Sequence, residues 1–127
     1  MTPEYVAGLF DGEGCVTIHQ SNRIFKLRCT IAMTCLSILE KLKTKYGGSI
    51  HQCKGTNKPV YHWQIYTESA KQFLVDIAPH VQVKQAEVEL ALNFVEVCIG
   101  RRGYKLSPDE LNLRSEYKSR LQRLKTL

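Results

Sequence analysis

The sequence predicts an α+β domain in which helices cover one face of an antiparallel sheet. Segments with helical caps and helical spacing of apolar residues are separated by pairs of segments in which apolar and polar residues alternate. The order is helix, hairpin, helix, hairpin, helices. The length of 127 residues, 43% of them hydrophobic, is enough for one domain with its own core. We therefore expect a single domain over 1–127, with a core over 1–99 and a basic C-terminal extension over 100–127.

The first helix begins at Thr2, whose hydroxyl is a helix cap, and Pro3 follows at the first helical position. It ends near Gly12, and a hairpin follows with strands over 15–20 and 25–33. The second of these strands alternates cleanly, so one face is predicted to be buried. The buried face carries Phe25, Leu27, Cys29, Ile31 and Met33.

The second half repeats this order. A helix over 36–46 ends at two glycines, and strands over 49–54 and 60–67 form the next hairpin, with Trp63 in the core. A helix over 69–78 is stopped by Pro79. The remaining elements are a largely covered helix over 83–99, a basic break at 100–103, and a last helix opened by Ser107-Pro108-Asp109-Glu110.

The net charge of +6 and the pI near 9.1 favour a polyanionic partner, with nucleic acid the first candidate. The excess is uneven: residues 1–100 carry ten basic and nine acidic side chains, whereas 101–127 carry eight and three. The last helix therefore either tracks phosphates or is a solvated amphipathic helix.

Several protein classes are excluded by the same inspection. No apolar run approaches the ~20 residues of a membrane span, and the start lacks the features of a signal peptide. Five cysteines without CxxC spacing argue against a disulfide framework or a zinc ribbon. We therefore expect a soluble protein in a reduced intracellular compartment. Four of the cysteines are expected to be buried or half-buried: Cys15, Cys29, Cys35 and Cys98.

The second face of the predicted sheet is polar and basic. Such a row suits the reading of base edges in a DNA major groove, although a solvated sheet face has a similar composition. Its members are Thr17, His19, Lys26, Arg28, Thr30, His51, Cys53, His62 and Gln64.

The end of the first helix breaks two local rules. Gly8 lies inside the helix, where glycine costs about 1 kcal/mol relative to alanine, and Asp11 and Glu13 lie at the C-terminal end, where the helix dipole favours cations. Gly8 and Gly12 are four residues apart, so a second helix can approach closely on that face. Two such helices would bring their carboxylates together, and a divalent cation would compensate this charge.

Residues 6–14, Val-Ala-Gly-Leu-Phe-Asp-Gly-Glu-Gly, resemble the LAGLIDADG motif of homing endonucleases. The αββαββα order over roughly residues 3–99 resembles the fold of that family as well. The resemblance implies a saddle-shaped sheet on a long, nearly palindromic DNA duplex. It also implies Mg²⁺ (or Mn²⁺) ions at the centre, which cut both strands across the minor groove and leave 3′ overhangs.

The resemblance also implies roles for single residues. Glu13, the eighth motif residue, would hold the metal with the carbonyl group of Gly12, while Asp11 would orient the helix end. Lys84 matches the place where the family often has a basic residue near the scissile phosphate. Arg23, in the first hairpin turn, joins the polar face as a candidate DNA contact.

The resemblance further implies a C2 homodimer, because one motif supplies only one such carboxylate. The expected seam is formed by Ala7, Gly8, Asp11 and Gly12.

One departure from the family and two alternatives stay open. Many relatives have a glutamine after the second strand, where this chain has Thr34-Cys35, so the arrangement that positions water is not defined. The main alternative to a nuclease is a DNA-binding regulator or an intron RNA splicing helper on the same fold. A fragment of a two-motif enzyme is a third.

Overall fold

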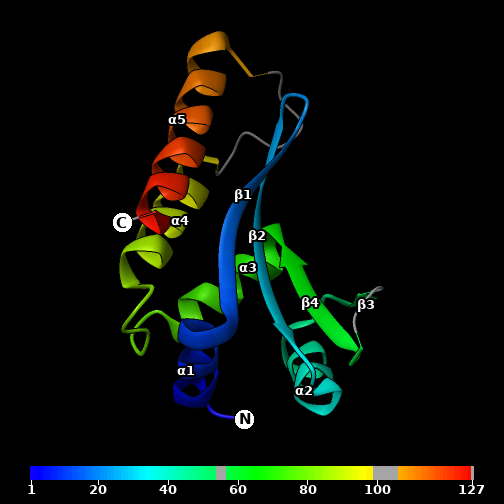
Figure 1. The fold of residues 1–127 in the computed structure, drawn as a ribbon. Helices are drawn as coiled ribbons and strands as arrows, with labels where there is room; N and C mark the ends of the chain where they lie inside the picture. Colours follow the sequence, from blue (N-terminus) through cyan, green and yellow to red (C-terminus); the bar gives the residue numbers. More distant parts are fainter. Residues whose placement is uncertain (54–56, 99–105, 127) are drawn as a thin grey trace.

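The computed structural model describes residues 1–53, 57–98 and 106–126 (Figure 1). Five helices and four strands make up this part of the chain. In chain order they are α1 (Pro3–Glu13), β1 (Gly14–Ser21), β2 (Ile24–Met33), α2 (Leu36–Tyr46), β3 (Ser49–Cys53), β4 (Val60–Tyr66), α3 (Thr67–Ile77), α4 (Gln85–Cys98) and α5 (Pro108–Lys125).

The four strands form one antiparallel sheet with the order β1-β2-β4-β3. Each hairpin contributes an inner and an outer strand, and β2 pairs with β4 at the centre, where Thr30 lies opposite Gln64. The predicted α+β class, with an αββαββα core and an additional C-terminal helix, is confirmed.

The core lies between the apolar face of the sheet and the helices. From β2 it takes Phe25, Leu27, Cys29 and Ile31, as the alternation predicts, and Met33 is partly buried at its border. Trp63 is fully buried beneath β4, and its ring lies edge-on to Phe73 of α3. The indole N–H donates to the carbonyl oxygen of Gly47 at 2.9 Å, so this buried polar group is satisfied.

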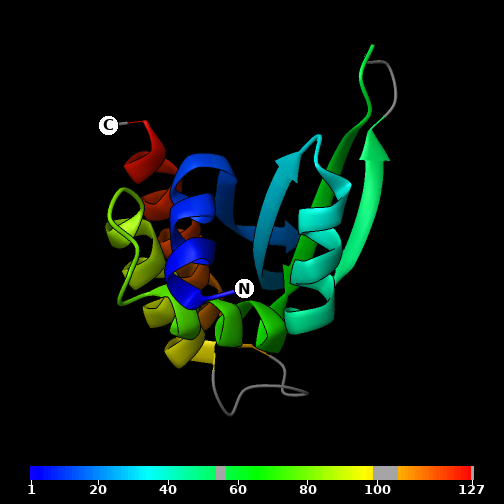
Figure 2. The same cartoon turned by 90° about the horizontal axis from the view of Figure 1, so that it is seen from below.

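The helices span the sheet from edge to edge, with α1 and α3 between the other helices. α2 contacts β3 and β4, whereas α4 and α5 pack against each other and against β1 (Figures 1 and 2). α5 begins with the predicted cap: the Ser107 hydroxyl accepts the N–H of Glu110, and the Glu110 carboxylate accepts the N–H of Ser107. Within the described ranges, no helix is both long and apolar enough to cross a bilayer.

Two helices begin at other residues than predicted. α3 begins at Thr67 rather than Ser69, because β4 ends at Tyr66, which takes the N-cap position. α4 begins at Gln85 rather than Val83, because the N–H groups of the preceding residues bind a side chain of α1. The predicted strand residue Lys54 and the basic break at 100–103 lie outside the described residues.

Candidate functional site

The site is built on the exposed side of α1 and the turn that follows it. The helix is capped at Thr2, whose hydroxyl accepts the N–H of Tyr5 at 3.2 Å, and its core side buries Val6, Ala7 and Phe10. Ala7 is 0% exposed, so its side chain belongs to the core of this chain. The dimer seam that includes Ala7 stays a prediction, and within one chain the Ala7 side chain faces the core.

The glycines within and directly after α1 lie in different packing environments. A Cβ at Gly14 would lie 2.2 Å from the ring of Phe10, so the packing of this chain itself requires glycine there. Apart from the adjacent residues and the helix's own backbone, a Cβ at Gly8 or Gly12 would have no atom of the described residues within 4 Å, and both glycines are exposed. Nothing within the described chain therefore explains why this face of α1 lacks side chains.

Asp11 joins the end of α1 to the segment that precedes α4. Its carboxylate accepts three consecutive backbone N–H groups, from Gln82 at 2.8 Å, Val83 at 3.1 Å and Lys84 at 3.0 Å. Burial alone would raise the pKa of Asp11, but these hydrogen bonds and the nearby charge of Lys84 outweigh it and lower the pKa below 3.8. Both oxygens of the carboxylate are thus engaged in holding backbone.

The ammonium group of Lys84 lies at the same place. Its Nζ donates to the backbone oxygen of Asp11 at 3.2 Å, and the side chain is partly buried. The Lys84 ammonium group is therefore held at the last turn of α1, where its acceptor Asp11 precedes Glu13 by two residues.

Glu13 is the last residue of α1, and its side chain is exposed. In the described ranges, it takes part in no hydrogen bond or ion pair. The carboxylate of Glu13 and the carbonyl group of Gly12 are hard oxygen donors of the kind that Mg²⁺ prefers. The described part of one chain contains no group of three Cys, His, Asp or Glu residues that could hold a metal. The donor set fits a magnesium site in kind, and a single copy supplies only part of it.

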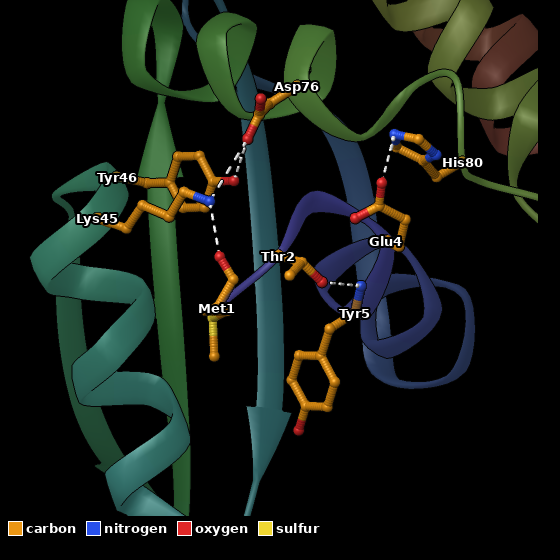
Figure 3. Close-up of polar contacts among 8 residues, drawn as sticks. All are labelled: Met1, Thr2, Glu4, Tyr5, Lys45, Tyr46, Asp76 and His80. Atoms are coloured by element: carbon orange, nitrogen blue, oxygen red, sulfur yellow. Dashed lines mark hydrogen bonds and ion pairs between the residues drawn. The ribbon is translucent and has the colours of Figure 1, made fainter.

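The start of α1 is tied to two other parts of the chain (Figure 3). Lys45 donates to the backbone oxygen of Met1 at 3.0 Å and lies 3.9 Å from Asp76, which also accepts the hydroxyl of Tyr46. Burial and the bond to Asp76 raise the pKa of Tyr46, so the hydroxyl remains a donor.

The second tie is at the first turn of α1. Glu4 lies 3.6 Å from His80, in the segment between α3 and α4 (Figure 3). Together with Asp11, these contacts hold both ends of α1 in a defined orientation.

The predicted polar face exists as a single face of the sheet. The registers Thr17↔Arg28, His19↔Lys26, Thr30↔Gln64 and His51↔His62 place its members side by side, and Cys53 follows His51 on the same side of β3. Arg28 donates to the hydroxyl of Thr17 at 3.1 Å. Arg23 is exposed in the turn between β1 and β2. The charged and polar side chains therefore lie together on one face of the sheet.

Further residues that were not predicted share this face, and the polar and aromatic ones with side chains of note are Cys15, Ser49 and Tyr66. Tyr66 lies two residues after Gln64, so alternation carried one step further identifies it, and its ring packs edge-on to His19. Ser49 lies within 3.3 Å of the His51 ring nitrogen.

The cysteine predictions are correct for three residues and wrong for Cys35. Cys29 is buried, and Cys15 and Cys98 are partly buried, but Cys35 is exposed because it lies at the N-cap of α2, outside the core stripe of that helix. Its sulfur contacts the hydroxyl of Ser37 at 3.3 Å, and this contact lowers the pKa of the thiol.

Comparisons with known proteins agree with this architecture. The structure is similar to the homing endonuclease I-CvuI in complex with the I-CreI target in the presence of Mg, with a TM-score of 0.78 and 17% identity over 96% of this chain and 80% of that one. It is similar to the archaeal intron-encoded homing endonuclease I-Vdi141I complexed with DNA, with a TM-score of 0.78 and 17% identity over 95% and 82%.

A third similar structure is the homing endonuclease I-TnaI, with a TM-score of 0.74 and 19% identity over 97% of this chain and 95% of that one. A search of curated proteins found no significant match. At the level of sequence, the family model described as LAGLIDADG endonuclease matches residues 6–95, which is most of the chain and includes most of α1, the sheet and Lys84. The chain therefore belongs to the LAGLIDADG endonuclease family.

Proposed function

We propose that this chain is a Mg²⁺-dependent, site-specific DNA endonuclease that works as a C2 homodimer and breaks both strands of a long, nearly palindromic site. One observation carries the proposal. An open glycine face on α1 ends in Glu13, an exposed carboxylate that no described residue engages, while the neighbouring Asp11 is fully used in holding backbone.

The homodimer follows from that face. Gly8 and Gly12 lack side chains where this chain gives no steric reason for it, and Tyr5, 50% exposed, lies on the same side of the helix. A second α1 packed there would bury the exposed apolar surface and place two Glu13 carboxylates next to each other. One chain then forms half of the site.

Mg²⁺ would be held by Glu13 and the carbonyl group of Gly12 from each copy. When bound, it supplies charge neutralisation at the phosphate and a more acidic water molecule. It also offsets the repulsion between two carboxylates at negative helix ends.

Lys84 is proposed to place its ammonium group near the scissile phosphate, because Asp11 fixes its backbone and its Nζ already lies at the end of α1. In the hydrolysis, water attacks phosphorus in line, the bond from phosphorus to the leaving oxygen breaks, and that oxygen takes up a proton. A fixed positive charge stabilises the negative charge that develops on the phosphoryl oxygens.

The polar face of the sheet is proposed to read the DNA bases through groups that donate and accept hydrogen bonds. The candidate contacts are Thr17, His19, Arg23, Lys26, Arg28, Thr30, His51, Cys53, His62 and Gln64. The DNA complexes of I-CvuI and I-Vdi141I, which share this fold, support the choice of duplex DNA as the partner.

The test is a cleavage selection from a randomised duplex library with Mg²⁺, followed by assays on the selected site. Glu13→Gln is expected to abolish cleavage while binding persists, because it removes the metal-binding charge and keeps the shape. Glu40→Gln, which removes an exposed carboxylate on α2, is the matched control and should cleave normally. Cleavage by the Glu13→Gln protein at the normal rate, or no cleaved sequence in the selection, would refute the proposal.

A further inference from the structure

Two lysines of α5 reach the outer edge of the sheet. Lys118 Nζ donates to the side-chain oxygen of Gln20 at 3.1 Å, and Lys125 Nζ lies 3.3 Å from the sulfur of Cys15. Both acceptors belong to β1, which is an edge strand, and α5 runs beside it (Figure 1). We refer to Lys118 and Lys125 as the edge lysines.

The positive charges of the edge lysines are not neutralised by the part of the chain that the structure describes. Their acceptors are an amide oxygen and a thiol, neither of which is a carboxylate. The ion pairs found among the described residues are Lys45 with Asp76 and His80 with Glu4, and neither involves α5. The edge lysines are therefore positioned by the fold while their charge remains available to an anion.

Their position relates them to the polar face. Cys15 lies opposite Thr30 and shares that face, so the ammonium group of Lys125 borders it directly. Gln20 pairs with Phe25 on the other face of β1, near the far end of the strand, so Lys118 lies across the edge strand from the polar face, toward the tip of the hairpin. In a duplex, the backbone phosphates flank the base edges in the grooves, so a surface beside a base-reading face meets phosphates.

We propose that the edge lysines bind backbone phosphates of the duplex DNA whose bases the polar face reads. The inference rests on the proposed function and adds a second, sequence-independent contact surface to it. The edge lysines set how strongly the protein binds DNA and how steeply salt weakens binding, while the polar face sets the sequence.

The experiment compares two double variants that remove the same charge from the same helix. Lys118→Gln with Lys125→Gln removes the edge lysines. Arg120→Gln with Arg123→Gln is the matched control, because these arginines lie roughly opposite the edge lysines by helical spacing and line a hollow between α4 and α5. Binding of the selected site and of a scrambled duplex is measured against salt concentration in Ca²⁺, and circular dichroism checks folding.

Loss of the edge lysines from a dimer removes four phosphate contacts. We expect the slope of log binding constant against log salt to become shallower by about 3 to 4, since each neutralised phosphate contributes about 0.9. Binding of both duplexes should weaken by similar factors, and the arginine variant should keep the slope within about 1 of the unaltered protein.

A slope unchanged by the edge-lysine variant, or changed equally by the control, would overturn the inference even if the protein cleaves its site. An unchanged DNA slope with lost binding to structured RNA would reassign the edge lysines to RNA and overturn it as well. If the unaltered protein bound no duplex DNA, the proposed function itself would fail.

Discussion

Asp11 and Lys84 each bind the backbone of the other. The carboxylate of Asp11 accepts the N–H of Lys84 at 3.0 Å, and the Nζ of Lys84 donates to the backbone oxygen of Asp11 at 3.2 Å. The two contacts lock the end of α1 to the segment that begins α4, although the residues are 73 positions apart in the sequence. This reciprocal clamp places a positive charge at the last turn of α1, which ends at Glu13, and leads to the first three predictions.

The clamp should contribute measurably to stability. Asp11→Ala leaves three backbone N–H groups without their acceptor, and we expect a loss of about 2 kcal/mol in the free energy of unfolding, measured by urea denaturation. Asp109→Ala is the control: this exposed aspartate of the first turn of α5 interacts mainly with the helix dipole, so about 0.5 kcal/mol is expected. Equal losses in the two variants would contradict the clamp.

Stability should also depend on pH through Asp11. Its pKa in the folded chain is below 3.8, so its stabilising contribution is present above the unfolded value and is lost as pH falls through the folded value. Asp11→Asn removes this titration, and its free energy of unfolding should therefore fall less steeply below about pH 4 than that of the unaltered protein. Urea denaturation from pH 5 to pH 2.5 measures both curves, and parallel curves would refute the prediction.

The effect of Asp11 on cleavage should pass through Lys84. Lys84→Met is expected to lower kcat by about 100-fold, in line with the loss of one group that stabilises transition-state charge. Asp11→Asn should lower kcat less, and the double variant should match Lys84→Met within about threefold, because no positioned ammonium group remains. Multiplied effects of the two substitutions would instead show that they act independently. The assay is single-turnover cleavage of the selected site.

A glycine inside α1 and the glycine directly after it should respond oppositely to an added side chain. Gly8→Leu should stabilise the helix of a single chain by up to about 1 kcal/mol, because leucine has a higher helix propensity and the added side chain meets open space. The same side chain should block the dimer seam. Sedimentation should then report monomers without cleavage.

Gly14→Ala supplies the comparison, because its Cβ would overlap the ring of Phe10. It should destabilise the fold by about 1 to 3 kcal/mol while the remaining folded protein still associates. A stable, dimeric and active Gly8→Leu protein would remove the argument for the seam.

Local sequence patterns predicted the fold because its elements have local causes. The alternation in β2, the hydroxyl cap at Thr2 and the cap at Ser107 depend only on neighbouring residues, and the structure confirms each of them. The sequence is less informative where contacts with a distant segment determine the burial of a side chain or the end of a helix. Val6, Ala7 and Phe10 form the core side of α1, and a small residue such as Ala7 gives no sign of the side on which the rest of the protein will lie.

The candidate site was predictable only in part for the same reason. The open glycines and Glu13 lie within nine residues and break local preferences, so they are visible in the sequence. The partners of Asp11, more than 70 positions away, have no local signal, because backbone N–H groups carry no residue identity. The contacts of Lys118 and Lys125 with β1 also have no local signal, because the sequence does not distinguish these two lysines from the other basic residues around them.

The strict alternation of β2 and β4 has an evolutionary consequence. Because neighbouring residues point to opposite faces, Leu27, Cys29, Trp63 and Ile65 maintain the core, while Arg28, Thr30 and Gln64 can be exchanged without disturbing it. These three side chains are partly buried, and substitutions outside the core usually change stability far less than substitutions within it. If the proposed function holds, a lineage with this sheet can change the DNA sequence that it recognises by small steps, while the end of α1 and the folded scaffold are inherited unaltered.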